Sequence, residues 1–512
     1  MSHLIIVPVV LPALMAAFLV LAARHDMVLQ RVLSASSAVL LLACALFLYG
    51  LAAEGQPVPY LLGDWPAPFG IVLVLDRLSA LMLVLTGILG VAVALFAMTG
   101  RDTGGRHFHA LLQFQLMGIN GAFLTGDLFN LFVFFEVLLI ASYGLMLHGG
   151  GPRRLGAGLH YVIVNLVGST LFLFAVGMIY AVTGTLNMAD LAIAASQVAP
   201  GDAALLRAGG GLLLTVFAIK AALVPFHWWL RGTYSAAPAP VAALFAIMTK
   251  VGAYSIIRVF TLIFGAGAGD AAWLAAPWIL PAALVTLVLG TIGLLASRTL
   301  FDLAAFSIVA SMGTLLIAVG LFTPEAMTAA LYYLIHSTFT GAALFMVGGI
   351  VATGRGETGD RLVAAAPFPR DQLVAGLFFL AAIAMAGMPP LSGFLGKLLI
   401  LESAKDGPLM SWIWAIVLGT SLLMLVGFGR AGSVLFWKSA AVAGDGSRPV
   451  AGTGNALPLI ATTTVIAGTA LLALLAGPAT AELDRTTQQI FDPTGYVRAV
   501  LGDEAAMQIA ER

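Results

Sequence analysis

Four ionisable side chains lie deep inside long apolar runs of this 512-residue sequence. Glu136 is the acid in "LTGDLFNLFVFFEVLLIASYGL", and Lys220, Lys250 and Lys397 are the three amines. At about 1.5 Å per helical residue, Glu136 lies about 12 Å, Lys220 about 21 Å and Lys250 about 14 Å from one end of its run. Lys397 follows a Pro-Pro pair in mid-run. All four therefore lie near the middle third of a bilayer whose hydrocarbon core is about 30 Å thick.

Each such charge costs at least about 2.5–3.5 kcal/mol at the centre of a span. One interpretation is static, with Glu136 pairing a lysine and holding two helices together. One acid does not neutralise three lysines, however, so the surplus amines must be hydrated or uncharged part of the time. Burial favours the neutral amine, whereas a nearby carboxylate favours the charged one. A lysine whose charge depends on a neighbouring group is the element that a proton relay requires.

Histidines and hydroxyl groups extend this set. His336 lies in "YYLIHSTFTGAALF", where Ser337 and Thr340 could hold water beside it. Imidazole exchanges protons near neutral pH, although a single histidine in a helix is as often a structural group. We expect His336 to belong to the relay. His227, Ser337, Thr340 and Glu402 are accessory candidates.

Two of the lysines lie close to prolines within their runs. Pro225 comes five residues after Lys220 in "FAIKAALVPFHWWL", and Pro389 and Pro390 precede Lys397 in "AGMPPLSGFLGKLLI". Proline removes a backbone donor and breaks a helix locally. In lipid, the freed carbonyl must find protein or water. A packing kink is the simpler interpretation, but the adjacent lysines favour a discontinuous helix that lines an ion site.

The elements that position these residues are membrane-spanning helices. Apolar residues make up 61% of the sequence and charged residues only 9%, which is typical of an all-α polytopic membrane protein. The first apolar run is long enough to span and is expected to stay as a helix. We predict fourteen spans, at 4–23, 32–53, 76–99, 107–125, 128–147, 160–184, 206–230, 241–264, 273–296, 302–322, 327–352, 371–403, 410–437 and 457–476. Asp76, Asp127, Asp302 and Glu402 end spans and are expected to reach the lipid headgroups.

Basic residues predict the orientation of the spans. Connections after odd-numbered spans hold fourteen Lys or Arg residues, and those after even-numbered spans hold four. The positive-inside rule places the first group in the cytoplasm, so both termini are predicted outside.

The two proline breaks predict an internal repeat. They lie five spans apart, and because five is odd, the second broken helix crosses the membrane opposite to the first. This is the pattern of an inverted-topology repeat. We expect residues 1–106 to hold helices 1–3 and residues 107–264 the first repeat, helices 4–8. Residues 273–438 would hold the second repeat, helices 9–13, and residues 457–512 helix 14 and a polar tail.

Other kinds of site have no signal in the sequence. Cys44 is the single cysteine, and no Cys/His cluster, phosphate loop or nucleophile triad appears. The formal net charge is zero, and no basic patch indicates nucleic acid. We expect no cofactor, no metal site and no nucleic-acid partner.

Four long segments resemble a known family: "FHALLQFQLMGINGAFLTGDLFNLFVFFEVLLIASYGL", "FAIKAALVPFHWWL", "YSAAPAPVAALFAIMTKVGAY" and "GMPPLSGFLGK". They resemble the proton-translocating antiporter-like subunits of complex I and of Mrp (Pha/Mnh) multisubunit Na⁺/H⁺ antiporters, over about residues 70–440. Within that group, "NLFVFFEVLLIASYGL" and "APAPVAALFAIMTKVG" look most like the D-type member of Mrp antiporters.

The resemblance implies a role for each buried group. Glu136 matches the glutamate of the fifth helix, Lys220 its lysine partner in the seventh and Lys250 the lysine of the eighth. His336 matches the histidine of the eleventh helix, and Lys397 the residue near the proton exit in the twelfth. Three features depart from the family pattern: Thr340 replaces a lysine, Arg231 replaces a proline, and "TLFDLAAFSIVASMG" lacks the usual basic residues.

The sequence therefore predicts a proton-translocating subunit of a multisubunit Na⁺/H⁺ antiporter rather than an enzyme. The resemblance implies partners of the Mrp A, B, C, E, F and G types, a bilayer, protons and Na⁺, in a bacterial inner membrane. The alternative is a proton-pumping membrane subunit of complex I or of a membrane-bound hydrogenase. A structural scaffold without ion conduction is the third class.

Overall fold

The computed structural model describes residues 2–407, 409–439 and 456–510, and these are almost entirely helical. Two short strands, β1 (Val58–Leu61) and β2 (Val72–Leu75), pair antiparallel with Val58 opposite Leu75. The helices are α1 (Val7–Leu21), α2 (Met27–Ala53), α3 (Arg77–Ala97), α4 (Phe108–Leu124), α5 (Leu128–Met146), α6 (Pro152–Thr183), α7 (Met188–Ala194), α8 (Ala203–Lys220), α9 (Trp228–Ala236), α10 (Ala239–Leu262), α11 (Ala276–Ala296), α12 (Leu300–Leu321), α13 (Pro324–Gly354), α14 (Asp371–Ala386), α15 (Ser392–Ser403), α16 (Met410–Gly432), α18 (Leu457–Leu474), α19 (Ala476–Phe491), α20 (Pro493–Leu501) and α21 (Asp503–Ala510).

Every predicted span coincides with a helix or with two consecutive helices, which confirms the all-α polytopic fold. Among the described residues, 12 helices are long and apolar enough to cross a membrane. The other two predicted spans are short or divided. The fourth is α4, with 17 residues, and the twelfth is divided into α14 and α15, with 16 and 12 residues.

Three helices form the centre of the bundle. All residues of α10 are buried, and the most apolar windows of α12 and α13 are 94% and 89% buried. In the peripheral helices α1, α2, α16 and α18, only a third of the most apolar window is buried. These helices expose leucine and valine side chains on the outside of the bundle. The exposed faces of these outer helices carry many large apolar side chains, as expected where lipid replaces water.

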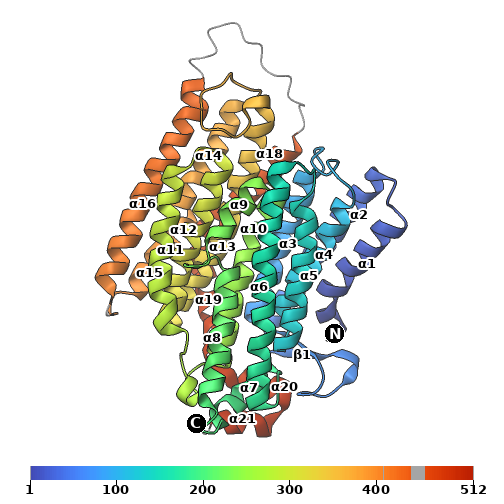
Figure 1. Ribbon diagram of the computed structural model, residues 1–512, viewed down its shortest axis with the longest axis vertical. Helices are drawn as coiled ribbons and strands as arrows, with labels where there is room; N and C mark the ends of the chain where they lie inside the picture. The colour runs from blue at the N-terminus through green and yellow to red at the C-terminus, as the bar shows by residue number, and fades with distance from the viewer. Residues whose placement is uncertain (1, 408, 440–455, 511–512) are drawn as a thin grey trace.

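The termini and the connections that contain β1 and α7 lie toward one end of the molecule. Figure 1 shows the N-terminus, β1, α7, α20, α21 and the C-terminus together at this end. Two termini at the same end agree with a chain that crosses the membrane an even number of times. That this end faces outside stays a prediction.

The packing of α4 on α5 recurs in α11 on α12. Gly118 and Gly121 of α4 lie directly against Leu138 and Phe134 of α5, so that a side chain at either glycine would clash. In the second pair, Gly290 and Gly293 of α11 lie in the same way against Ala310 and Phe306 of α12. Each of the four residues in the second pair follows its counterpart in the first pair by the same number of residues. The common shift indicates a repeated pair of helices joined by a similar turn.

The backbone at the start of each pair repeats as well. The Leu128 N–H donates to the Leu186 carbonyl at 2.9 Å, and the Leu300 N–H donates to the Asp360 carbonyl at 2.8 Å. The first pairing lies beside α7, and the second lies at the opposite end of the bundle (Figure 1). These contacts support an inverted repeat of residues 107–264 and 273–438. The boundaries of the four predicted regions stay a prediction.

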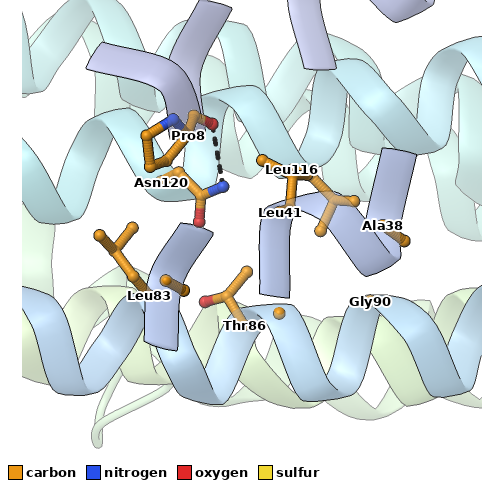
Figure 2. A pocket seen from close by; sticks show the side chains of 10 residues that line it. Pro8, Ala38, Leu41, Leu83, Thr86, Gly90, Leu116 and Asn120 are labelled. Atoms are coloured by element: carbon orange, nitrogen blue, oxygen red, sulfur yellow. Dashed lines mark hydrogen bonds between the residues drawn. The ribbon is translucent and has the colours of Figure 1, made fainter. Parts of the chain in front are cut away.

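A proline in α1 shows how this fold satisfies a carbonyl that has lost its partner. Pro12 lies inside α1 and has no N–H to donate to the Pro8 carbonyl one turn earlier. The Asn120 side-chain amide of α4 donates to that carbonyl instead, at 3.0 Å. Figure 2 shows this bond at the edge of a small pocket between α1, α2, α3 and α4, with Thr86 beside it. The pocket has a volume of about 10 Å³, room for about one water molecule.

Candidate functional site

The first predicted helix break separates α8 from α9. Lys220 is the last residue of α8, and the chain resumes a helix at Trp228 after a turn that contains Pro225. The indole N–H of Trp229 donates to the Ile219 carbonyl at 2.9 Å. The Val224 N–H donates to a hydroxyl of α11. Because other groups satisfy the broken backbone, the Lys220 amine is left free for side-chain partners.

Glu136 and Lys220 are connected through α6 rather than by direct contact. The Lys220 Nζ donates to the Asn165 Oδ1 at 2.6 Å, and the Ser169 hydroxyl donates to a Glu136 carboxylate oxygen. Among the described residues, no ion pair joins Glu136 to Lys220. The two groups therefore interact electrostatically without a direct ion pair, and their partnership in a relay stays a prediction. Residues 165 and 169 are one helical turn apart and lie on the same face, so α6 carries the link.

A small cavity opens beside Lys220, and Phe135, the neighbour of Glu136, is among the residues that line it. Lys220, Asn165 and Tyr161 line it together with Val251 of α10. Its volume of about 10 Å³ holds about one water molecule. Val251 and Met248 belong to α10, the helix that carries Lys250, so α10 forms one wall of the cavity.

Lys250 lies in the most buried helix and is itself fully buried. Its Nζ makes one long hydrogen bond, 3.5 Å to the Thr249 hydroxyl, and no ion pair with any described residue. A buried ammonium with so few partners is costly, and a water molecule or a proton acceptor nearby would lower the cost.

His336 lies between the second and third lysines. It is fully buried on α13, and both Lys250 and Lys397 are near enough to interact with it electrostatically. Its Nδ1 lies 2.9 Å from the Ser392 hydroxyl and 3.4 Å from that of Thr340. Its Nε2 has no hydrogen-bond partner within the described part of the chain. The imidazole is therefore anchored through its Nδ1, and the Ala384 backbone also interacts with the ring.

The second predicted break separates α14 from α15 and contains Pro389 and Pro390. Here the lysine itself satisfies the backbone. The Lys397 Nζ donates to the carbonyl of Ala386, the last residue of α14, at 2.9 Å and to the Ser421 hydroxyl of α16 at 2.7 Å. Both breaks are therefore confirmed, and each places a buried lysine beside interrupted backbone.

The accessory candidates fall into two groups. Thr340 contacts His336, whereas the Ser337 hydroxyl is occupied by a carbonyl of its own helix. His227 is half-buried at the first break, and its Nδ1 is unpaired among the described residues. Glu402 is exposed and forms an ion pair with Lys405, as a group at headgroup level would.

Two acids that were expected to reach headgroups are instead buried in ion pairs. Asp76 lies 2.6 Å from Arg258, with its side chain only 3% exposed, and Asp302 lies 2.8 Å from Arg231. A residue at the end of a span in the sequence can still face the protein, because short connections fold back over the bundle. Arg231, where the family pattern has proline, thus has a defined partner. Among the described residues, no three His, Cys, Asp or Glu side chains are grouped to hold a metal ion.

Sequence reasoning missed the polar partners of the relay residues: Asn165, Ser169, Ser392 and Ser421. A signal existed for the first two, because they are spaced four residues apart within an apolar span and so share a face. The other two approach their partners from different helices, and no local pattern in the sequence indicates those contacts.

Comparison with known proteins identifies the family of this chain. A family model described as "NADH:quinone oxidoreductase/Mrp antiporter, TM" matches residues 125–425, which include all five predicted relay residues. The chain belongs to this family. Its similarity to individual members extends over nearly its whole length.

Two curated relatives and one solved structure are similar to this chain over nearly its whole length. A Rhizobium meliloti protein, named as a probable K⁺/H⁺ antiporter component of the D type, is 40% identical over 98% of each chain. A Bacillus subtilis protein, named as the D component of a Na⁺/H⁺ antiporter, is 36% identical over 98% of this chain and 100% of its own. A chain in the Mrp complex from Dietzia sp. DQ12-45-1b has a TM-score of 0.87 at 29% identity, covering 98% of this chain and 100% of that chain. The predicted resemblance to the D-type member of Mrp antiporters is confirmed.

Proposed function

We propose that this chain is the proton-translocating subunit of a multisubunit cation/proton antiporter in a bacterial inner membrane, with both termini outside. Full-length similarity to two D-type antiporter components supports the class of protein. The observation that carries the proposal is the row of three buried lysines and one histidine along the centre of the bundle. A scaffold has no need for four such groups, and each is costly to bury.

The proton would move by short transfers between these groups. Lys220 would exchange a proton with a water molecule in the cavity beside it, and further water would connect that cavity to Lys250. Water would then connect Lys250 to the Nε2 of His336, and the Ser392 side of the ring would pass the proton toward Lys397. Thr340, in place of the lysine of other relatives, holds the ring but carries no charge. Each charge moved across the membrane is worth about 2.3 kcal/mol per 100 mV.

Glu136 would set the proton affinity of Lys220 through α6. The Ser169 and Asn165 side chains extend the carboxylate toward the amine without neutralising it. Glu136 is also partly exposed on the side of the bundle. A neighbouring subunit could therefore attract or release this carboxylate and so couple its own state to the charge on Lys220. We expect neighbours of the Mrp A, B, C, E, F and G types.

The exchanged cation is Na⁺ in our proposal, but the relatives' names divide between K⁺ and Na⁺. Among the predicted relay residues only Glu136 is an acid, and it has a proton role here. The cation would therefore cross at a different place in the complex. Transport assays with Na⁺ and with K⁺ in turn show which of these cations is exchanged.

The second candidate is a proton-pumping membrane subunit of a redox complex, because the family's description also includes NADH:quinone oxidoreductase. The two candidates differ in their partners. Antiporter subunits that purify with this chain would support the first, and subunits that bind electron-transfer cofactors would support the second.

The test is proton antiport in vesicles that contain the assembled complex, followed with a pH-sensitive dye after a pulse of Na⁺ or K⁺. Lys220→Ala and Glu136→Ala should abolish exchange while the complex still assembles. Lys405→Ala is the control, since this lysine is exposed and paired with Glu402. Wild-type rates in the first two variants would exclude the relay and favour a scaffold.

A further inference from the structure

A buried ion pair outside the relay faces the end of the molecule that holds both termini. Arg258 of α10 and Asp76, which precedes α3, lie 2.6 Å apart, with side chains 7% and 3% exposed. The Tyr254 hydroxyl lies 3.4 Å from the same guanidinium. Removing both charges from water costs several kcal/mol per ion, so such a pair is weak evidence of a purely stabilising role.

The pair is aligned with the relay. Lys250, Tyr254 and Arg258 are spaced four residues apart on α10, so they lie on one face of the helix. Arg258 is about 12 Å from Lys250 along the axis. The Tyr254 hydroxyl donates to the Phe123 carbonyl of α4 at 2.6 Å, which holds the ring between the two cations. A polar face of α10 therefore extends from the central lysine toward the predicted outer end.

The C-terminal tail covers this face. The Tyr496 ring of α20 lies with its centre 5.3 Å from the Arg258 guanidinium carbon, and the side chain is buried. Its hydroxyl has no hydrogen-bond partner among the described residues. Burial raises the pKa of this hydroxyl above its ordinary value, so it stays neutral. An ion pair between Glu482 and Arg77 and a bond between Thr487 and Thr328 fix the preceding α19 on the bundle.

A cavity of about 310 Å³ lies on the other side of α20. Thr261, one turn beyond Arg258 on α10, lines it together with Gly265 and Trp273, and Pro493 and Thr494 of α20 form the opposite wall. This volume holds several water molecules. Residues two apart on a helix point to nearly opposite sides, so α20 faces the cavity with Thr494 and the ion pair with Tyr496.

We propose that Tyr496 is a gate between this cavity and the Asp76–Arg258 pair, and that the polar face of α10 is a route for protons between the outer side and Lys250. The proposal rests on the proposed proton transport. The groups that face Arg258 are Asp76, Tyr254 and Tyr496, with Asp127 close enough to interact with Tyr496. Moving the tyrosine ring would let water reach the pair and hydrate its charges.

The alternative role for Tyr496 is an anchor of the tail. An anchoring tyrosine normally bonds through its hydroxyl when buried, and this hydroxyl is unpaired among the described residues. The ring, rather than the hydroxyl, is therefore the functional part. Tyr496→Phe keeps the aromatic ring that closes the route, whereas Tyr496→Ala removes it. The two substitutions are therefore a matched pair of variants.

The test measures access rather than transport. In the assembled complex, Cys44→Ala removes the single native cysteine, and a new cysteine is placed at Thr261 in the cavity or at the fully buried Ser255, one turn inward of Arg258. Ag⁺ added outside sealed vesicles is the probe, because it is small and binds thiols. The rate of thiol loss is then followed by labelling after denaturation.

We expect the Thr261→Cys thiol to react at least about tenfold faster than the Ser255→Cys thiol, since access scales with the population of the open state. Tyr496→Ala should accelerate the reaction at Ser255→Cys by at least about tenfold, whereas Tyr496→Phe should leave it within about twofold. If Tyr496→Ala does not assemble, Tyr496→Leu replaces it.

An unchanged rate at Ser255→Cys in the opened variant, or an unreactive thiol at Thr261→Cys, would overturn the gate. Neither result bears on the antiport assay, which uses different variants and a different readout. Loss of antiport in Lys220→Ala together with unchanged Ag⁺ access would keep the relay and exclude this route.

Discussion

The two helix breaks are equivalent in position but differ in what satisfies the interrupted backbone. At the first break, the Trp229 indole bonds the Ile219 carbonyl, and Lys220 before the break bonds the Asn165 side chain. At the second, Lys397 after the break bonds the Ala386 carbonyl directly. The first lysine has an acid within reach through α6, whereas the nearest titratable partner of the second is His336.

This difference assigns different roles to the two halves. An amine held by side chains changes partners at little cost to the fold, so Lys220 is suited to switching. An amine that also satisfies a backbone carbonyl is needed for the structure, because a buried unpaired carbonyl costs about 1–3 kcal/mol. Lys397 is therefore suited to a fixed position at the end of the relay. The variants below test this contrast, beginning with the largest effect.

Removing the switching amine should have the largest effect. Lys220→Ala should lower the antiport rate at least about a hundredfold, because it removes the amine that Glu136 reaches through α6, and a loss of that size corresponds to about 2.7 kcal/mol. Dye-monitored antiport in vesicles measures it, with Lys405→Ala as the unaffected control. A rate within twofold of wild type would remove the first half from the mechanism.

The fixed amine should affect stability more than the switching one. Lys397→Ala leaves the Ala386 carbonyl without its donor, so the free energy of unfolding should fall by about 1–3 kcal/mol. Lys220→Ala leaves the Ile219 carbonyl bonded to Trp229 but takes the donor from the Asn165 Oδ1. A side-chain amide can turn toward another partner, so this variant should lose less stability than Lys397→Ala. Midpoints of thermal aggregation of the purified complexes compare them. Equal midpoints would show that the two breaks do not differ as described.

Interrupting the link through α6 should have a smaller effect than removing the lysine. Asn165→Leu keeps the side-chain volume but removes the acceptor for Lys220, and we expect about a tenfold slower antiport, near 1.4 kcal/mol. Thr170→Ala, on the exposed face of the same helix, is the control. Unchanged antiport in Asn165→Leu would mean that Glu136 acts on Lys220 without α6.

The smallest effect is expected from the indole that shields the first break. Trp229→Phe keeps an aromatic ring but removes one hydrogen bond, worth about 0.5–1.5 kcal/mol. The Ile219 carbonyl then keeps only the Ala222 N–H as a donor, so Lys220 could turn to it, and antiport should slow by about two- to tenfold. Trp414→Phe removes a similar indole bond, to the Leu401 carbonyl, away from both breaks. Equal slowing in both variants would argue against a special role for Trp229.

The sequence was sufficient for the fold and for the positions of the charged groups. Apolar runs and prolines predicted the helices and both breaks, because these depend on local composition. It could not show that Lys220 bonds Asn165 rather than Glu136. Which of two polar groups meets an amine depends on the rotation of α6 against α8, and that rotation is set by packing far along the chain.

The buried position of Asp76 was also out of reach for sequence reasoning. Its place at the end of a span is the same whether it faces lipid headgroups or protein. The tail that covers it, α19 to α21, is polar enough to be read as a surface helix. Only its docking on α13 and α10, through contacts such as Thr487 with Thr328, encloses the ion pair.

The central claim is that water connects Lys220, Lys250 and His336 at the middle of the bilayer. The most direct measurement is a structure of the assembled complex at a resolution that shows ordered water. We predict density for water in the cavity beside Lys220 and between Lys250 and the Nε2 of His336. A dry, closed contact between apolar side chains at both places would contradict the relay.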